Sequence, residues 1–239
     1  MNTAKPNYLP KHVTWHYENT AITLAESLAR AIAQCLSQAL QHRPRASLAV
    51  SGGRTPTAMF SALSQQNIAW HRIDITLVDE RWVDESHSAS NAALVRQHLL
   101  QNAASAAHFT PLFNSAASNL DGCLDCHQQL YNISRPIDVV VLGMGNDGHT
   151  ASLFPNCPHL AHAMAETNTS ICAATTAPTE PQQRITLTAQ QLHLARHKFL
   201  HLVGADKLQT LQQAMHLRSP SKMPIFAFLQ RPLSIYWSA

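Results

Sequence analysis

Five of the seven glycines of this 239-residue chain lie in two short runs, and each run directly follows an apolar, β-like stretch. The first run is Ser51-Gly52-Gly53-Arg54-Thr55-Pro56, and the second is Gly143-Met144-Gly145-Asn146-Asp147-Gly148-His149-Thr150. Glycine adopts backbone conformations with positive φ and lets backbone N–H groups approach a ligand closely. Glycines gathered at strand ends therefore predict a loop-built anion site, with phosphate as the expected ligand.

The first quarter of the chain reads as a helix followed by a strand–loop–helix unit. Leucine and isoleucine recur with helical spacing from Thr20 to Gln41, and His42-Arg43-Pro44 closes that helix. Residues 47–50 form a short strand that runs into the first glycine run. Thr55 and Pro56 then supply an N-cap and a first-turn proline for a helix to about residue 65.

The same order of elements repeats along the rest of the chain. Apolar, β-branched runs predict strands at 73–78, 137–142, 184–188, 199–203 and 233–237. Helical patterns lie between them at 91–102, 119–133 and 205–216, and residues 167–183 read as an irregular excursion. We therefore predict an α/β protein, a single domain over residues 1–239, with an open, mostly parallel sheet flanked by helices.

Polar residues cluster where these strands end. Gly52, Asp79, Gly143 and Gly204 all follow strands of the predicted sheet. In open parallel sheets, ligands bind outside the carboxyl ends of the strands. One site at this edge is therefore expected to collect all of the motifs.

Charge and composition exclude several classes of function. The net charge is +3 with neutral histidines, and no dense stripe of lysine and arginine is present, so we expect no nucleic-acid partner. No apolar window reaches the roughly 18 residues of a membrane span, and residues 1–15 contain no apolar core of an export signal. The five cysteines are an odd number in a chain too long to need disulfides, so we interpret them as reduced thiols in a cytoplasmic protein.

Two short patterns suggest cofactors, and their contexts argue against both. Gly143 to Gly148 has the spacing G-x-G-x-x-G of dinucleotide-binding loops, but Pro155 follows too soon for the long helix of that unit. Cys123-Leu124-Asp125-Cys126-His127 matches the c-type haem attachment pattern. It lies inside a helical segment and lacks the second pair of ligands that a zinc site needs. We expect neither a cofactor nor a metal.

His149 is the strongest candidate for acid–base chemistry. Its unperturbed pKa near 6.5 suits a general base at neutral pH, and a tight glycine turn at a strand end holds it in place. Asp147 either orients this histidine or caps the following helix. Asp79, Glu80 and Arg81 stand at the end of another strand, where they form a surface ion cluster or part of the site. Arg184 lies at the start of a predicted strand and Lys207 at the start of a predicted helix. Each of them either binds a phosphate or is a solvated surface cation.

Taken together, these segments resemble the 6-phosphogluconolactonase family over nearly the whole chain. The most specific match is the run from Leu142 to Pro155, LGMGNDGHTASLFP. The other matching segments, in the same order along the chain, are Ser51-Gly52-Gly53 with Thr55-Pro56, Asp79 to Val83, Ser90-Asn91, Arg184 to Thr188 and Gly204 to Lys207.

This resemblance implies a Rossmann-like sheet and the hydrolysis of 6-phospho-D-glucono-1,5-lactone to 6-phosphogluconate without cofactor or metal. It implies that His149 activates water for attack on the lactone carbonyl, and that Asp79 and Arg81 face the sugar or support the site. For the oxyanion, Arg81 and the backbone N–H groups of residues 143–145 are our candidates. The substrate- and phosphate-binding residues that we predict are Ser51, Gly52, Gly53, Arg54, Thr55, Gly143, Gly145, Arg184 and Lys207.

Two rival interpretations stay open at the level of sequence. Glucosamine-6-phosphate deaminases share this fold and a similar histidine run, but in them a glutamate assists the histidine where this chain has Phe154. A sugar-phosphate-binding regulatory module would carry an added DNA-binding helix-turn-helix. Only about 45 residues precede the first predicted strand here, which argues against this interpretation. The number of subunits is not specified by any of these patterns.

Overall fold

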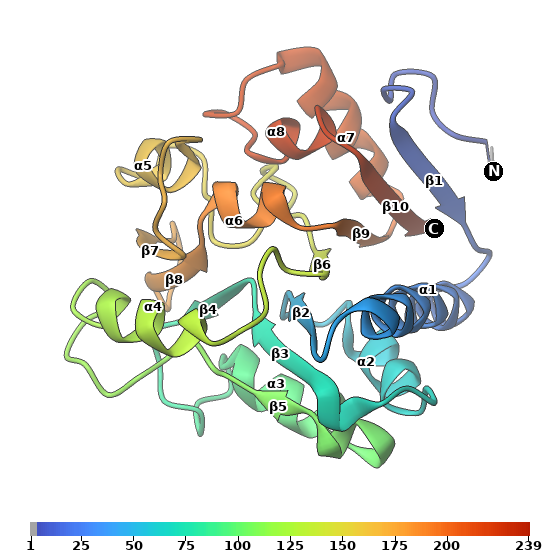
Figure 1. The fold of residues 1–239 in the computed structure, drawn as a ribbon. Coiled ribbons are helices and arrows are strands. Elements are labelled where there is room, and N and C mark those ends of the chain that lie inside the picture. Colours follow the sequence, from blue (N-terminus) through green and yellow to red (C-terminus); the bar gives the residue numbers. More distant parts are fainter. Residues whose placement is uncertain (1–3) are drawn as a thin grey trace.

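The computed structural model describes residues 4–239, and its centre is a seven-stranded parallel sheet (Figure 1). The strands follow the spatial order β1-β10-β9-β6-β2-β3-β5, and each neighbouring pair is parallel. Their bounds are β1 Val13–Tyr17, β2 Ala46–Val50, β3 Ile73–Leu77, β5 His108–Phe109, β6 Val139–Leu142, β9 His197–Val203 and β10 Leu233–Ser238. The prediction of an open, mostly parallel α/β sheet is confirmed.

Helices cover this sheet. They are α1 Ala21–His42, α2 Thr57–Ser64, α3 Asn91–His98, α4 Cys123–Tyr131, α5 Leu160–Met164, α6 Ala189–Leu194, α7 Asp206–Leu217 and α8 Ile225–Leu229, with short 3-10 turns at Trp70–Arg72 and Asn102–Ala106. The longest, α1, contacts β2, β6, β9 and β10 and buries its leucine and isoleucine stripe against them. The hydroxyl of Thr20 caps it, accepting a hydrogen bond from the Thr23 N–H at 3.1 Å.

A second, three-stranded antiparallel sheet lies on the side of the molecule away from α1 (Figure 1). It consists of β4 Asp79–Arg81, β8 Gln183–Leu187 and β7 Cys172–Thr176, with β8 in the middle. In this sheet Arg81 is the register partner of Arg184. Segments about one hundred residues apart in the sequence thereby bring two guanidinium side chains together.

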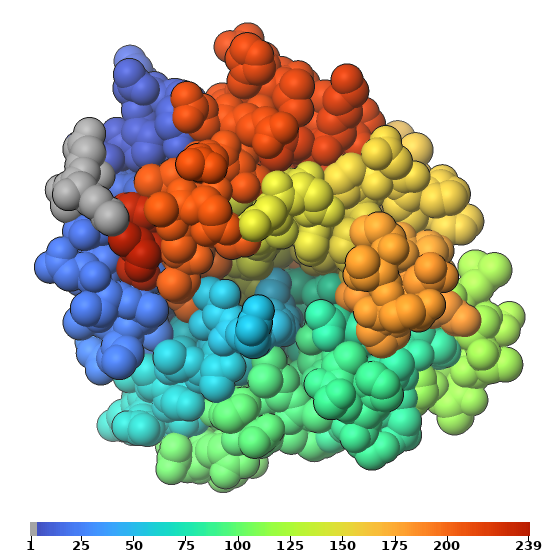
Figure 2. All heavy atoms as spheres, turned by 180° about the vertical axis from the view of Figure 1, so that it is seen from behind, coloured from blue at the N-terminus to red at the C-terminus, as the bar shows by residue number. Residues whose placement is uncertain are grey.

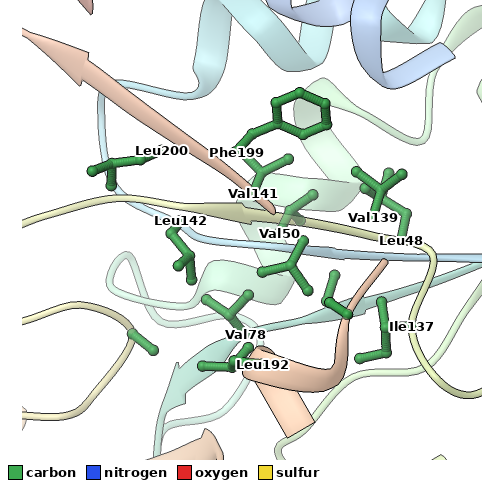
Figure 3. Packing of buried hydrophobic residues seen from close by; sticks show 14 of the residues in the cluster. Leu48, Val50, Val78, Ile137, Val139, Val141, Leu142, Leu192, Phe199 and Leu200 are labelled. Atoms are coloured by element: carbon green, nitrogen blue, oxygen red, sulfur yellow. The ribbon is translucent and has the colours of Figure 1, made fainter. Parts of the chain in front are cut away.

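The core forms where the central strands meet the covering helices. Every residue of β2, β3 and β6 is buried, as expected for parallel strands covered on both faces. Figure 3 shows Leu48, Val50, Val139 and Val141 packed together, with Phe199 on one side of the strands and Val78 and Leu192 on the other. This apolar packing holds the strand ends, and the loops that leave them, in fixed positions.

Three local predictions were wrong. The first strand, β1, lies well before residue 45; it is a half-exposed edge strand whose pairing with β10 sets its conformation. Pro56, not Thr55, occupies the N-cap position of α2, and no side chain caps that helix. The excursion at 167–183 contains β7, because small residues such as Ala173 find a partner strand in β8. Within residues 4–239, no helix is both long and apolar enough to cross a membrane.

Candidate active site

The two glycine runs lie side by side at the carboxyl edge of the central sheet. β9, β6, β2 and β3 are neighbours, so the loops that follow them surround one place. A cavity of about 220 Å³ lies there. Figure 2 shows a hollow near the centre of this face, between the cyan and teal segments below and the yellow and orange segments above. The expected convergence of the strand-end motifs is confirmed.

The cavity is lined by nearly all of the side chains and glycines that we predicted to form a site. Asp147 is the exception: it does not line the cavity but holds His149, which does. The predicted residues in the lining are Ser51, Gly52, Gly53, Arg54, Thr55, Asp79, Arg81, Gly143, Gly145, His149, Arg184 and Lys207.

His149 is oriented by a carboxylate two residues earlier in the chain. Its Nδ1 lies 2.6 Å from Oδ1 of Asp147, and the same oxygen accepts the His149 backbone N–H at 3.1 Å. Burial raises the pKa of Asp147, but the hydrogen bonds and the charge interaction with His149 lower it by more. The net effect is a pKa below the usual value. An ionised Asp147 fixes the proton of the imidazole on Nδ1 and leaves Nε2 as the proton acceptor.

The backbone of Gly145 forms the other support of His149. A Cβ atom at residue 145 would lie 2.2 Å from Cε1 and Nδ1 of His149 and 2.7 Å from Oδ1 of Asp147. The ring therefore packs directly on the glycine, and its other side meets Phe154 with ring centroids 4.5 Å apart. This close approach is the physical reason for a glycine at position 145.

Hydrogen bonds tie the second glycine run to itself and to the first. The Gly145 N–H donates to the His149 carbonyl at 2.9 Å, and the Gly143 N–H donates to the Ser51 hydroxyl at 3.1 Å. The Thr150 hydroxyl donates to the Gly143 carbonyl at 2.8 Å. Two of the three backbone amides that we considered as oxyanion donors are therefore already engaged. Among residues 4–239, the Met144 N–H of this group has no acceptor.

Positive charge dominates the lining of the cavity. The residues that line it include four cationic side chains, which are Arg54, Arg81, Arg184 and Lys207. The carboxylate among the described lining residues is Asp79. Burial and the neighbouring Arg81 lower the pKa of Arg184, whose side chain donates from Nε to the Pro181 carbonyl at 2.7 Å. Two guanidinium groups held close together with little solvent favour an anionic ligand between them.

Lys207 reaches the cavity from the first turn of α7. Its ammonium donates a hydrogen bond to the side-chain oxygen of Asn146, and Asp206 lies 3.8 Å away. Asn146 belongs to the second glycine run, so this contact places the lysine charge close to the His149 loop. Lys207 and His149 therefore line the same cavity.

The first glycine run is shaped by contact with α3. Gly53 has a φ of +92°, which side chains disfavour, and a Cβ at Gly52 would lie 1.9 Å from Oδ1 of Asn91. Asn91 in turn donates from Nδ2 to the Asp79 carbonyl at 2.9 Å. A single asparagine therefore fixes the distance between the glycine loop and the Asp79 segment.

Three residues of this region were not among the predicted site residues: Asn91, which the sequence analysis named as a helix start, Glu80, which it left open as part of an ion cluster, and His201, which it did not single out. Asn91 and His201 line the cavity, whereas Glu80 is fully buried beneath it. Glu80 accepts backbone N–H bonds from Arg81, Asn91 and Ala92 at 2.7–2.8 Å. Burial raises its pKa to about 7 despite these bonds. Glu80 lies on β4 and reaches the first N–H groups of α3 only through the tertiary fold, so no local sequence pattern indicated this contact.

The cysteine–histidine motif does not form part of this site. Cys123 and Cys126 lie on α4, and both thiols contact that of Cys172 on β7. All five cysteines are free in the structure. Within residues 4–239, no group of three or more histidine, cysteine or carboxylate side chains is arranged to hold a metal ion.

The fold and the cavity together define an α/β protein with a cation-rich pocket at the carboxyl edge of its parallel sheet. A family model described as "Glucosamine-6-phosphate isomerases/6-phosphogluconolactonase" matches residues 19–237. The chain is 44% identical to a 6-phosphogluconolactonase of Pseudomonas aeruginosa, with 96% of each chain covered. It is 43% identical to one of Mesorhizobium japonicum, over 90% of this chain and 91% of the relative.

A solved structure shows the same likeness. The crystal structure of a 6-phosphogluconolactonase from Shewanella baltica superposes with a TM-score of 0.93 at 43% identity, covering 97% of this chain and 100% of that one. The chain belongs to the glucosamine-6-phosphate isomerase/6-phosphogluconolactonase family.

Proposed function

We propose that this chain hydrolyses 6-phospho-D-glucono-1,5-lactone to 6-phospho-D-gluconate, a step of the oxidative pentose phosphate pathway, with His149 as the general base. The chain is a hydrolase that acts on a lactone, in keeping with its identity to curated lactonases over nearly its whole length. The observation that carries the mechanism is the 2.6 Å pair of His149 and Asp147 in a cavity rich in cations.

Water activation is the first step. Asp147 accepts a hydrogen bond from the Nδ1–H of His149, which keeps that proton on Nδ1. The free Nε2 then takes a proton from a water molecule while that water attacks C1 of the lactone. A lactone is an activated ester, and a positioned base of this kind contributes roughly 10² to 10⁴-fold. No covalent intermediate on the enzyme is required.

The attack converts the lactone carbonyl into an oxyanion. We assign its stabilisation to Arg81, which lines the cavity, and to the Met144 N–H, which has no acceptor among the described residues. When the tetrahedral intermediate collapses, the bond from C1 to the ring oxygen breaks. The imidazolium of His149 returns its proton to that oxygen, which becomes the C5 hydroxyl of the product.

The substrate phosphate is bound by cations and backbone amides. Lys207 and Arg184 supply charge, and the loop of Gly52 and Gly53 presents N–H groups that have no acceptor within residues 4–239. Ser51 uses its hydroxyl oxygen to accept the Gly143 N–H, which leaves its proton for the ligand. Arg54 and Thr55 complete this side of the cavity.

The deaminase alternative requires a second carboxylate next to the histidine. The structure has the ring of Phe154 there, packed on His149. An aromatic ring excludes water and cannot take up a proton. The carboxylate that contacts the imidazole is Asp147. Phe154 in the place of the second carboxylate favours lactone hydrolysis over release of ammonia from glucosamine 6-phosphate.

The remaining parts of the proposal concern the surroundings of the enzyme. Its partner is the sugar-phosphate lactone, with no nucleic acid and no membrane involved. The cytoplasmic location expected from the sequence stays part of the proposal, and five free thiols fit a reducing compartment.

The experiment that tests this function follows the disappearance of lactone generated in situ, with spontaneous hydrolysis subtracted. The wild type is compared with His149→Ala and with His216→Ala, which alters an exposed histidine of α7. We expect the first variant to lose roughly 10² to 10⁴-fold in kcat and the second to equal the wild type. Retained turnover in a folded His149→Ala variant would refute the role of His149 as general base. Release of ammonia from glucosamine 6-phosphate by the wild type would refute the proposed lactonase activity.

A further inference from the structure

A buried carboxylate stands directly behind the cavity. Glu80 lies in the middle of β4, between Asp79 and Arg81, and is fully buried. Successive side chains of a strand point to opposite faces, so Asp79 and Arg81 line the cavity while Glu80 points away from it, towards α3. Taking a carboxylate out of water is costly, so a buried glutamate at this position needs a physical reason.

The carboxylate of Glu80 connects two separate segments of the chain. Its Oε1 accepts the backbone N–H groups of Arg81 and of Asn91, both at 2.8 Å, and its Oε2 accepts that of Ala92 at 2.7 Å. One oxygen atom thus joins the end of β4 to the start of α3, which begins eleven residues after Glu80. Both residues that this oxygen holds, Arg81 and Asn91, line the cavity.

Capping of α3 does not account for this arrangement. The hydroxyl of Ser90 already caps the helix, accepting the Ala93 N–H at 3.2 Å. A short polar side chain of this kind satisfies a helix start at little cost, whereas a glutamate from another strand adds the cost of its desolvation. What Glu80 adds to the local cap is a fixed position of α3 relative to β4.

The connection extends from α3 to the first glycine run. Asn91 donates from Nδ2 to the Asp79 carbonyl at 2.9 Å, and its Oδ1 would lie 1.9 Å from a Cβ at Gly52. A shift of the first turn of α3 would therefore move the side chain that limits the Gly52 loop. A shift of the Arg81 backbone would likewise move its guanidinium within the cavity.

We infer that Glu80 is a positioning residue of the active site: its carboxylate holds Arg81 and Asn91, and through Asn91 the Gly52 loop, at the spacing that the ligand requires. This inference rests on the proposed function, which assigns Arg81 to the oxyanion and the glycine loop to the phosphate. Glu80 acts through backbone groups and touches no reacting atom. A glutamine of the same size has one acceptor oxygen instead of two and cannot accept all three N–H groups.

The charge of Glu80 depends on its surroundings. Asp79 and Arg81 flank it in β4, and Arg184 of β8 lies close enough to interact with its charge. The first turn of α3 presents N–H groups and no charged side chain. Burial, with a smaller effect of Asp79, raises the pKa of Glu80 to about 7, although the backbone hydrogen bonds lower it. The carboxylate is therefore mostly ionised at pH 8 and mostly protonated at pH 6.

The test removes the charge and keeps the size of the side chain. Glu80→Gln is compared with the wild type for thermal unfolding, for lactone turnover and for calorimetric binding of inorganic phosphate, at pH 8 and at pH 6. Asp138→Asn is the matched control, because Asp138 is also fully buried and accepts a backbone N–H, from Ser47 at 2.9 Å. It pairs with Arg43 and precedes β6, at the edge of the sheet opposite the cavity.

At pH 8 we expect Glu80→Gln to lower kcat roughly 10²-fold, the effect of displacing a group at the reacting centre by about 1 Å. Its Kd for phosphate should rise about tenfold, which corresponds to the loss of roughly one hydrogen bond. At pH 6 the ratio of the wild-type kcat to that of the variant should shrink to about ten, because roughly nine tenths of Glu80 is then protonated in the wild type too. Asp138→Asn should unfold at a lower temperature but keep the wild-type kcat and Kd at both pH values.

Three results would overturn the inference. They are wild-type kcat and phosphate affinity in folded Glu80→Gln, an equal loss in Asp138→Asn, and a kcat ratio that is the same at pH 6 and pH 8. If Glu80→Gln does not fold, Asn91→Ala tests the same connection: weaker phosphate binding at an unchanged unfolding temperature supports it, and wild-type binding overturns it. A wild type that binds phosphate but leaves the lactone intact refutes the proposed function, while the phosphate measurements still decide the role of Glu80.

Discussion

Gly145→Ala is the substitution whose effect the structure specifies most closely. The φ of Gly145 is not in the left-handed region, so alanine fits the backbone, but its methyl group would lie 2.2 Å from two atoms of the His149 ring. Ordinary contacts of a Cβ begin at 3.4 Å, so the imidazole must retreat by about 1 Å or more. The same methyl would lie 2.7 Å from Oδ1 of Asp147, so both members of the pair must move.

The size of the kinetic effect follows from that displacement. A misplacement of about 1 Å in a catalytic group lowers the rate by roughly 10²-fold, which corresponds to about 2.7 kcal/mol of transition-state stabilisation. We expect the loss in kcat rather than in KM, because the proposal assigns the phosphate to Lys207, Arg184 and the first glycine run. Thermal unfolding should change little, since residue 145 belongs to a partly exposed turn.

Gly143→Ala provides the contrast within the same loop. A Cβ at position 143 meets no atom within 4 Å and enters the space of the cavity. We expect it to raise KM while kcat stays near the wild-type value. Steady-state kinetics of both variants on the lactone separate the two effects. A Gly145→Ala enzyme that folds and retains kcat within about threefold of the wild type would refute the argument that this glycine positions the histidine.

The remaining predictions concern charge and protonation. Lys207→Ala should raise KM for the phosphorylated lactone much more than it lowers kcat, since it removes binding common to ground and transition states; an unaffected KM places Lys207 outside the site. Arg81→Ala should lower kcat by roughly 10² or more if the guanidinium faces the oxyanion, and unchanged turnover removes it from that role. His193 and His201 are neutral in the fold because burial lowers their pKa values to about 4, so below pH 6.5 the unfolded state binds protons that the folded state does not, and the free energy of unfolding falls by up to about 3 kcal/mol per histidine as the pH approaches 4. Denaturant unfolding of the wild type and the double variant His193→Phe, His201→Phe between pH 4 and 7 checks this: the wild type should lose more stability than the variant, and parallel curves contradict the assignment.

Local patterns were sufficient wherever the backbone itself carried the signal. The glycine runs, the apolar strands before them and the helical spacing of α1 depend on periodicity and on glycine conformations, which are properties of short segments. Because parallel strands end at one edge, these segments also predicted that Gly52, Asp79, Gly143 and Gly204 meet at one site, and the first three of them line the cavity. The role of His149 was predicted from its turn and from the family resemblance, and it stays a proposal.

The elements that were missed depend on partners distant in the sequence. β7 has a weak strand pattern and exists because β8 lies beside it, and β1 depends on β10 in the same way. The antiparallel pairing of β4 with β8 placed Arg81 opposite Arg184, an encounter that no local pattern predicts.

The sequence by itself determined the class of fold, the edge of the sheet that binds the ligand and most of the residues that line it. These depend on backbone conformation and hydrophobic period, which each segment carries within itself. Only the tertiary structure decided that the His149 ring packs on Gly145, that Asn91 limits the approach of Gly52, and that His201 lies buried without a hydrogen-bond partner among residues 4–239. Such contacts are set by how separate elements pack against one another, and packing is a property of the whole chain.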